Sequence, residues 1–431
     1  MRGTDVDSPD AGPFSPAKLG PLTLRNRLIK CATFEGMTPD ALVTDELVEF
    51  HREVAAGGVA MSTVAYCAVS PEGRTDRHQI WMRPEAMPGL RKLTDAIHSE
   101  GALAAAQLGH AGAVANSVSN RAKAWGPGRI PAPMGMSLTH KASVSDIAEL
   151  RVKFRQAARI AVDSGFDGLE IHCGHNYLIS SFLSPLLNHR RDAYGGSLVN
   201  RARMAREVVE SVREEVGDEA AIWVKLNTYD GVGKPDIERS PEARAKGRAK
   251  LSSFNVDEAC QVAQLLESDG HLDAIEPTAG SSLLNPMYLF HGEAPRKEFA
   301  AAFSGPMKYG LKAFAPIFLK RYQYHDGYLL PLARELRKAV DLPMILLGGV
   351  TDRASMDTAM AEGFEFMAMG RAILREPDLP LRIAADPTTT SKCVHCNLCM
   401  PTIYSHTRCP IRTGEVPDPL AVSPTVSGSA S

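Results

Sequence analysis

The stretch SDIAELRVKFRQAARIAVDSGFDGLEIH (145–172) contains the pattern from which the rest of the chain is built. Its first part has the apolar spacing of an amphipathic helix, with Ser145 as the predicted N-cap and Gly165 as the stop. The run 166–172 that follows is short and apolar, as expected of a buried strand, and it ends in a histidine. A helix followed at once by a strand is the repeating element of an alternating α/β protein.

Seven further apolar runs of this kind alternate with helical patterns along the chain. We predict strands at 27–33, 58–66, 102–109, 166–172, 221–227, 272–278, 343–349 and 364–370. Strands that are apolar without alternation belong to a parallel sheet covered on both faces. Repeated βα units form either a doubly wound sheet or a closed barrel, and eight units favour the barrel. The predicted fold class is therefore α/β, a (β/α)8 TIM barrel with a short C-terminal cysteine-rich extension.

Two stretches interrupt the regular alternation. Residues 231–253 are charged and contain proline and glycine, so we expect an exposed loop after the fifth strand. Residues 285–327 are rich in aromatics and long for a connection, so they either cover the barrel mouth or pack as a helical insertion on its flank. The predicted organisation is a flexible tail at 1–13, the barrel at 14–388, a cysteine-rich segment at 389–412 and a second flexible tail at 413–431.

Composition excludes several classes of protein. The chain has 431 residues with a formal net charge of −2 and no basic stripe, which argues against binding to nucleic acid. No apolar run approaches the roughly 18 residues of a membrane helix, and the N-terminus lacks the apolar region of a secretory signal. We expect a cytoplasmic protein that acts on a small molecule. Barrels of this type often associate into homo-oligomers, but the sequence does not fix the number of copies.

The turns after the last two predicted strands are rich in glycine. In such barrels catalytic groups lie at the C-terminal ends of the strands, and the turns after strands seven and eight often bind phosphate. Glycine allows the backbone to approach an anion closely, and arginine can add a charge-assisted clamp. The alternative is ordinary turn glycines beside a surface arginine. The predicted phosphate-binding residues are Gly348, Gly349, Gly370 and Arg371.

The segment EIHCGHNYL (170–178) places two histidines and a tyrosine directly after the fourth predicted strand. A metal site would need a third protein ligand, and nothing nearby supplies one. Two imidazoles, His172 and His175, can donate hydrogen bonds to one oxygen and stabilise negative charge there. Tyr177, protonated near neutral pH, can donate a proton. Lys225 ends the fifth strand at the same rim, where we expect it to act on a ligand electrostatically.

Several motifs resemble the old yellow enzyme family of flavin oxidoreductases. They are LTLRNRLIK (22–30), VSPEGR (69–74), QLGHAG (107–112), EIHCGHNYLISSFLSPLLNHRRDAYGGSLVNRARM (170–204) and MGRAILREPDLP (369–380). The resemblance covers residues 14–385 and is closest to the barrel part of members such as 2,4-dienoyl-CoA reductase and trimethylamine dehydrogenase. It implies FMN in a barrel and NAD(P)H as the reductant.

The resemblance also implies roles for individual positions. The residues that would line the isoalloxazine ring are Ala32, Thr33, Ala65 and Gln107. Lys225 would face N1 and O2 of the ring, and the glycines with Arg371 would hold the phosphate. The two histidines would bind a substrate carbonyl oxygen, and the tyrosine would protonate the α-carbon. One departure is that Phe34 and Glu35 stand where the family often has threonine or cysteine near the flavin C4 carbonyl.

Four cysteines crowd into CVHCNLCMPTIYSHTRCP (393–410), with the spacing C-x2-C-x2-C-x9-C-P. Four close thiolates suit an iron–sulfur cluster or a tetrahedral zinc, and a metal-free turn is the third alternative. Similar motifs follow the barrel in the two named family members, where they hold a [4Fe-4S] cluster. The resemblance thus implies ligation by Cys393, Cys396, Cys399 and Cys409. With no later glycine-rich fingerprint, FAD is not implied, and a cluster would need an electron-transfer partner or be structural.

Three functions follow from these observations. The leading hypothesis is an FMN-dependent ene-reductase that transfers hydride from NAD(P)H to the activated C=C bond of an α,β-unsaturated carbonyl or dienoyl substrate. The alternative is an oxidative amine dehydrogenase or demethylase that passes electrons through an iron–sulfur cluster to a partner protein. The third is a flavin-free scaffold whose cysteine motif binds a metal or a partner.

Overall fold

Eight parallel strands form a closed barrel in the computed structural model, which describes residues 11–233, 235, 237, 253–303 and 305–420. The strands are β3 (Leu28–Lys30), β4 (Met61–Ala68), β5 (Leu103–Gly109), β10 (Gly168–Cys173), β11 (Ala221–Asn227), β12 (Ala274–Thr278), β13 (Ile345–Leu347) and β14 (Phe366–Met369). Neighbours follow chain order, β14 pairs with β3, and a bridge between Ile275 and Met344 closes the ring. The predicted barrel and all eight predicted strands are confirmed.

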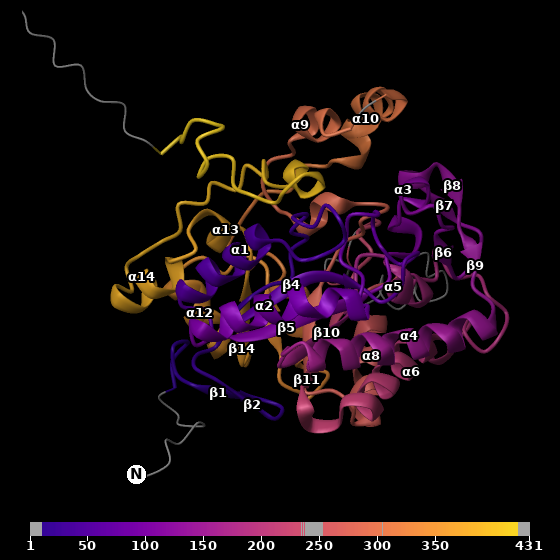
Figure 1. The fold of residues 1–431 in the computed structure, drawn as a ribbon, viewed down its shortest axis with the longest axis horizontal. Helices are drawn as coiled ribbons and strands as arrows, with labels where there is room; N and C mark the ends of the chain where they lie inside the picture. The colour runs from indigo at the N-terminus through magenta and orange to yellow at the C-terminus, as the bar shows by residue number, and fades with distance from the viewer. Residues whose placement is uncertain (1–10, 234, 236, 238–252, 304, 421–431) are drawn as a thin grey trace, which may run out of the picture.

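Helices cover the outside of the barrel between successive strands (Figure 1). They are α1 (Asp45–Ala56), α2 (Met87–Ser99), α4 (Val144–Asp163), α6 (Leu198–Val216), α8 (Val256–Asp269), α11 (Leu330–Arg337) and α12 (Arg353–Ala361), with α13 (Arg371–Arg375) and α14 (Leu379–Ala385) after the last strand. The predicted N-cap Ser145 is wrong. Ser143 caps α4 instead, because its Oγ accepts from the Asp146 nitrogen at 3.0 Å and the Asp146 carboxylate accepts from the Ser143 nitrogen at 2.8 Å.

The barrel interior changes character along its axis. At the N-terminal end, the hairpin of β1 (Ala17–Leu19) and β2 (Leu22–Leu24) packs in one apolar cluster with Trp223 and Phe366, and it lies at the bottom in Figure 1. Charged and polar side chains from β10, β11 and β12 occupy the part nearer the C-terminal end. The apolar end therefore closes the barrel, and the polar end is the one available for chemistry.

The aromatic-rich insertion lies at the C-terminal end of the barrel, together with the cysteine-rich segment (Figure 1). It contains α9 (Arg296–Ala301) and α10 (Gly305–Phe318), and its Met287 packs in one cluster with Met400. The Gly327 nitrogen donates to the Gly349 oxygen at 3.0 Å, which ties the insertion to the strand ends. Of the two predicted positions, the one at the mouth is observed.

Parts of the predicted organisation lie outside the described residues, namely most of the charged loop 231–253 and residues 1–10 and 421–431 of the tails. Residues 413–420 belong to the predicted C-terminal tail, yet Asp418 pairs with Arg375 at 2.7 Å. Within the described ranges, no helix is both long enough and apolar enough to cross a membrane.

Candidate active site

The two histidines and the tyrosine predicted to act together lie side by side at the C-terminal end of β10. The His172 ring centroid is 5.2 Å from that of His175 and 4.5 Å from that of Tyr177. The chain turns sharply after the strand because His175 and Asn176 adopt φ of 59° and 57°, a conformation uncommon outside glycine. Tyr177 then precedes the short helix α5 (Leu178–Leu183).

The state of these groups suits hydrogen-bond donation. Burial lowers the pKa of His172 well below its usual value, and it lowers that of His175 to about 3, with Lys225 acting in the same direction on both. Burial also raises the pKa of Tyr177, so the phenol stays protonated. His175 Nε2 lies 2.8 Å from Thr278 Oγ1, whereas the buried Nδ1 of His172 has no hydrogen-bond partner among the described residues. A buried polar atom without a protein partner is available to a ligand.

Tyr66, which the sequence analysis did not single out, completes this group of rings. Its ring centroid lies 5.5 Å from that of Tyr177, and its hydroxyl donates to the Gly73 carbonyl. Ala65 and Tyr66 belong to one apolar cluster against which Ala32 and Tyr177 pack, so two residues predicted to line a ring share a cluster with the predicted proton donor. Its place at the end of a predicted strand was a signal that could have identified Tyr66.

Lys225 lies inside the barrel between two buried carboxylates. Its Nζ is 2.8 Å from Glu170 Oε1 and 2.9 Å from Glu276 Oε1. Gln107 donates to Glu170 from Nε2, and Trp223 donates to it from Nε1 at 3.3 Å. Burial by itself would lower the pKa of Lys225, but the attraction of the two carboxylates outweighs it and raises that pKa. Lys225 therefore carries the expected positive charge. Its two acidic partners, Glu170 and Glu276, were not predicted from the sequence.

Thr33 and Glu35 both contact Lys30, which forms a second buried ion pair, distinct from that of Lys225, with Glu35. Lys30 Nζ lies 2.8 Å from Glu35 Oε1 and 3.1 Å from Thr33 Oγ1. Glu35 Oε2 accepts from the Ala65 nitrogen at 2.9 Å, so it holds the segment after β3 against β4. The acidic residue that departs from the family pattern is thus used to join two strands.

The predicted phosphate-binding turns lie at the same end of the barrel. Gly348 and Gly349 have φ of 100° and 86°, which favours glycine. A Cβ on Gly349 would collide with the Gly327 nitrogen, and one on Gly370 would come 2.9 Å from Cys31 Sγ. A side chain at Gly349 would therefore displace backbone, whereas one at Gly370 would require the Cys31 side chain to shift.

Arg371, predicted as the phosphate clamp, is buried against the insertion and the cysteine-rich segment. Its Nη1 donates to the His291 carbonyl at 2.8 Å and to Asn397 Oδ1. Its guanidinium carbon lies 5.8 Å from the centre of the Tyr324 ring and 5.9 Å from that of Tyr328. Arg371 thus lies at the rim as predicted, but its Nη1 already donates to two protein acceptors.

The four cysteines of the C-terminal motif are free thiols near one another. Burial raises the pKa of Cys399 to about 12, and it also raises that of Cys393, while Arg371 opposes both shifts. Within the described part of the chain, no group of three or more His, Cys, Asp or Glu side chains is arranged to hold a metal ion. The placement of these thiols therefore does not support the predicted metal site, and we assign no step to a cluster.

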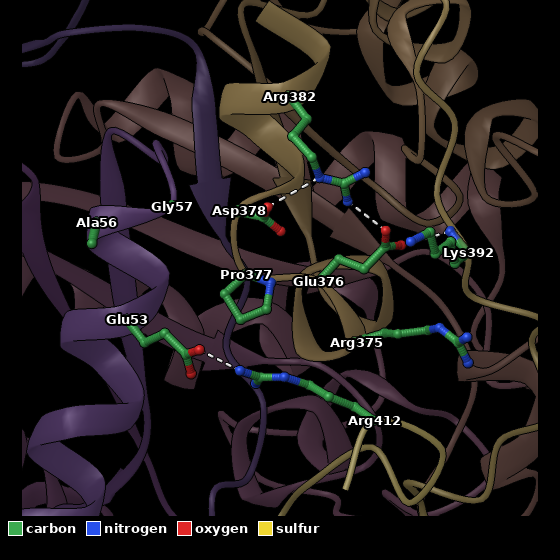
Figure 2. A pocket seen from close by; sticks show the side chains of 10 residues that line it. All are labelled: Glu53, Ala56, Gly57, Arg375, Glu376, Pro377, Asp378, Arg382, Lys392 and Arg412. Carbon is green, nitrogen blue, oxygen red and sulfur yellow. Dashed lines mark hydrogen bonds and ion pairs between the residues drawn. The ribbon is translucent and has the colours of Figure 1, made fainter. Parts of the chain in front are cut away.

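A pocket of about 530 Å³ lies outside the barrel, beside the end of α1 and the start of α14 (Figure 2). Its acidic groups are already paired, Glu53 with Arg412 and both Glu376 and Asp378 with Arg382. None of the residues predicted for catalysis or cofactor binding lines it. The ring cluster at the barrel mouth therefore stays the candidate active site.

Comparison with known proteins identifies relatives across the chain. A 4,4'-dithiodibutanoate disulfide reductase of Rhodococcus erythropolis is 49% identical over 405 residues, which cover 94% of this chain and 96% of the relative. A metal reductase of Desulforamulus reducens is 31% identical over 386 residues. These cover 89% of this chain but 50% of the relative, so the chain spans about half of that protein.

Solved structures share the fold at lower identity. A complex of 2-naphthoyl-CoA reductase with 2-naphthoyl-CoA matches with a TM-score of 0.74 and 23% identity, over 94% of this chain and 58% of that one. Morphinone reductase in complex with tetrahydroNAD matches with a TM-score of 0.66 and 21% identity, over 89% of this chain and 93% of that one. The model of the NADH:flavin oxidoreductase / NADH oxidase family matches residues 13–265. The chain therefore belongs to this family, as its old yellow enzyme motifs predicted, and is an NAD(P)H:flavin oxidoreductase.

Proposed function

We propose that the protein binds FMN at the barrel mouth and transfers hydride from NAD(P)H to the activated C=C bond of an α,β-unsaturated carbonyl or dienoyl compound. FMN, when bound, accepts the hydride and passes it on. The observation that carries the proposal is the pair of neutral imidazoles, His172 and His175, beside the protonated Tyr177.

The residues present fit FMN. Gly349 and Gly370 let these turns pack closely against Gly327 and Cys31, and the backbone N–H groups of such glycine turns can bind a phosphate. Lys225 supplies a buried positive charge between neighbouring strands. His172 offers a ring nitrogen that lacks a partner among the described residues.

The protein's own groups then act on the substrate in a definite way. Neutral His172 and His175 each carry one N–H, and both can donate to the carbonyl oxygen, where negative charge develops. Tyr177 holds a proton on its hydroxyl oxygen and delivers it to the α-carbon. Apolar Ala32 and Ala65 beside the phenol help to exclude water from the reacting atoms.

A disulfide is the second candidate substrate, favoured by the relative that is 49% identical along nearly the whole chain and is named a disulfide reductase. In that reaction hydride and a proton would convert one disulfide into two thiols. Tyr177 would then face a leaving thiolate, which is stable near neutral pH because its pKa is about 8.5.

Steady-state assays separate these possibilities. The purified, FMN-loaded protein is supplied with NADH or NADPH and, in parallel, with cyclohexenone or with 4,4'-dithiodibutanoate. We expect turnover of cyclohexenone with formation of the saturated ketone. Reduction of the disulfide alone would favour the second candidate. Turnover only with an amine and an artificial electron acceptor would favour the oxidative alternative and contradict both reductase proposals.

The cysteine-rich segment is kept outside this reaction. The family resemblance implies a [4Fe-4S] cluster here and the spacing also suits zinc, but among the described residues no group of three or more potential ligands is arranged to hold a metal ion. Iron, sulfide and zinc analysis of anaerobically purified protein shows whether the four cysteines bind a cluster, zinc or no metal. Stoichiometric iron would support the spacing and would raise the question of an electron-transfer partner.

Replacing Gly349 by alanine should weaken FMN binding about tenfold, equivalent to roughly 1.4 kcal/mol, because the new Cβ would displace the Gly327 backbone at the phosphate cradle. The dissociation constant can be measured by quenching of flavin fluorescence. Gly196→Ala is the matched control. It has a similar φ of 80° but nothing within 4 Å of the added Cβ, so it shares the backbone strain without the collision. Equal FMN affinity in both variants would contradict the assignment of the cradle.

A further inference from the structure

Three charged side chains meet at one level inside the barrel, contributed by three neighbouring strands. Lys225 of β11 stands in register with Glu276 of β12, and Glu170 of β10 reaches the same ammonium group. All three side chains are at most 3% exposed. Two carboxylates against one ammonium leave an excess of one negative charge if every group is ionised, which is costly in a buried site.

The two carboxylates are not equivalent. Glu170 accepts hydrogen bonds from Lys225, Gln107 and Trp223. Glu276 Oε1 lies 2.9 Å from Lys225 Nζ in an ion pair, and this atom has no hydrogen-bond partner among the described residues. The carboxylate with fewer donors is the one that more readily takes up a proton.

The electrostatics agree with this geometry. Burial raises the pKa of Glu276 to about 8, with repulsion by Glu170 and a hydrogen bond between the two carboxyl groups adding to the attraction for the proton, while Lys225 opposes it. Cys31 also faces this group, and its pKa is raised to about 11, so it stays neutral. His172, which stands in register with Lys225, and His175 beyond the strand end are neutral.

We propose that Glu276 is a proton-holding residue that, in the alkaline range, takes up one proton to offset the negative charge that flavin reduction would add near Lys225. Hydride from NAD(P)H carries two electrons and one proton, so its transfer to FMN held near Lys225 would add one negative charge to the site. One proton from solvent then converts the Glu276 carboxylate to the acid, which removes one negative charge. Glu276 is thus a positioning residue that acts through Lys225, and the inference rests on FMN binding as proposed above.

The protonation state of Glu276 before reduction determines at which pH the protein takes up a proton. Below about pH 8, Glu276 is already protonated before reduction, so reduction adds no proton there. Above that pH it is ionised before reduction, and the new negative charge raises its pKa so that it binds a proton. We therefore expect one extra proton per two electrons only in the alkaline range.

The test is the pH dependence of the midpoint potential of the bound flavin, measured by spectroscopic redox titration. Its slope gives the number of protons bound per two electrons. Above about pH 8 the wild-type protein should bind one more proton than Glu276→Gln, and the difference should vanish at lower pH. Glu170→Gln is the companion variant. It removes the repulsion, lowers the pKa of Glu276 and should shift the onset of the extra uptake to lower pH.

Two results would overturn the inference while leaving the proposed function intact. One is an equal proton number in wild type and Glu276→Gln throughout the alkaline range. If the variant fails to hold flavin, infrared difference spectra of the wild type provide the second measurement. Reduction at about pH 9 must then produce a new band of a protonated carboxyl group, and its absence overturns the inference. A wild-type protein without bound flavin would overturn the proposed function and this inference with it.

Discussion

Replacing Tyr177 by phenylalanine is expected to slow alkene reduction about 10²–10⁴-fold, with flavin reduction by NAD(P)H nearly unchanged. The substitution removes one hydroxyl and keeps the ring that packs against His172 with centroids 4.5 Å apart. Only the second half-reaction needs a proton at carbon, so only that half-reaction should lose rate. Stopped-flow spectroscopy of the flavin measures the two half-reactions separately.

Tyr66→Phe is the matched control for this experiment. Tyr66 contacts Tyr177, but its hydroxyl already donates to the Gly73 carbonyl and is not free for the substrate. It should therefore affect alkene reduction much less than Tyr177→Phe does. Equal losses in both half-reactions of Tyr177→Phe would contradict its role as the proton donor.

The same variant distinguishes the two candidate substrates. A carbanion-like carbon cannot persist in water, so its protonation by Tyr177 matters to the rate. A thiolate can leave without a proton, because its ordinary pKa of about 8.5 is close to neutral pH. Tyr177→Phe should thus reduce alkene turnover strongly and disulfide turnover only slightly, if the protein accepts both.

The sequence predicts the barrel because each strand is a local signal. Short apolar runs between glycines and helical patterns identify the eight strands, and parallel strands place their C-terminal ends at one rim. The ring cluster of His172, His175 and Tyr177 was predictable for the same reason, because its members are close along the chain. The structure adds the left-handed turn at His175 and Asn176 that brings the rings together.

Other features depend on contacts between distant residues, which a single sequence does not reveal. Glu170 and Glu276 are far apart in the chain and approach one ammonium group only because their strands flank β11. Arg371 was predicted from the local turn, but its acceptors come from the insertion and from Asn397. The spacing of four cysteines likewise identifies a motif, while the fold around it decides how the thiols lie.

Replacing Lys225 by alanine should lower the free energy of unfolding by about 3–5 kcal/mol near neutral pH, because it leaves the buried carboxylate of Glu170 without its cation beside protonated Glu276. In the variant, Glu276 has a pKa raised still further above that of the unfolded chain. Below the unfolded value, about 4.3, both states are protonated and the carboxyl group costs nothing; as pH rises from there towards the folded value, stability is lost. Wild-type Glu276 follows the same course up to its pKa of about 8, so the two proteins diverge only above that pH. The deficit should therefore be larger near pH 9 than near pH 7, as measured by urea unfolding.

Lys92→Ala is the control for this prediction. Lys92 Nζ lies 2.6 Å from Asp45 Oδ1, a distance as short as those of Lys225, but the two side chains are 60% and 90% exposed. An exposed pair of this kind contributes about 0–1 kcal/mol, so Lys92→Ala should change stability little and show no comparable dependence on pH. If Lys225→Ala behaved like Lys92→Ala at both pH values, the two buried carboxylates would not depend on Lys225. The charge balance proposed for the barrel interior would then be wrong, whatever substrate the enzyme reduces.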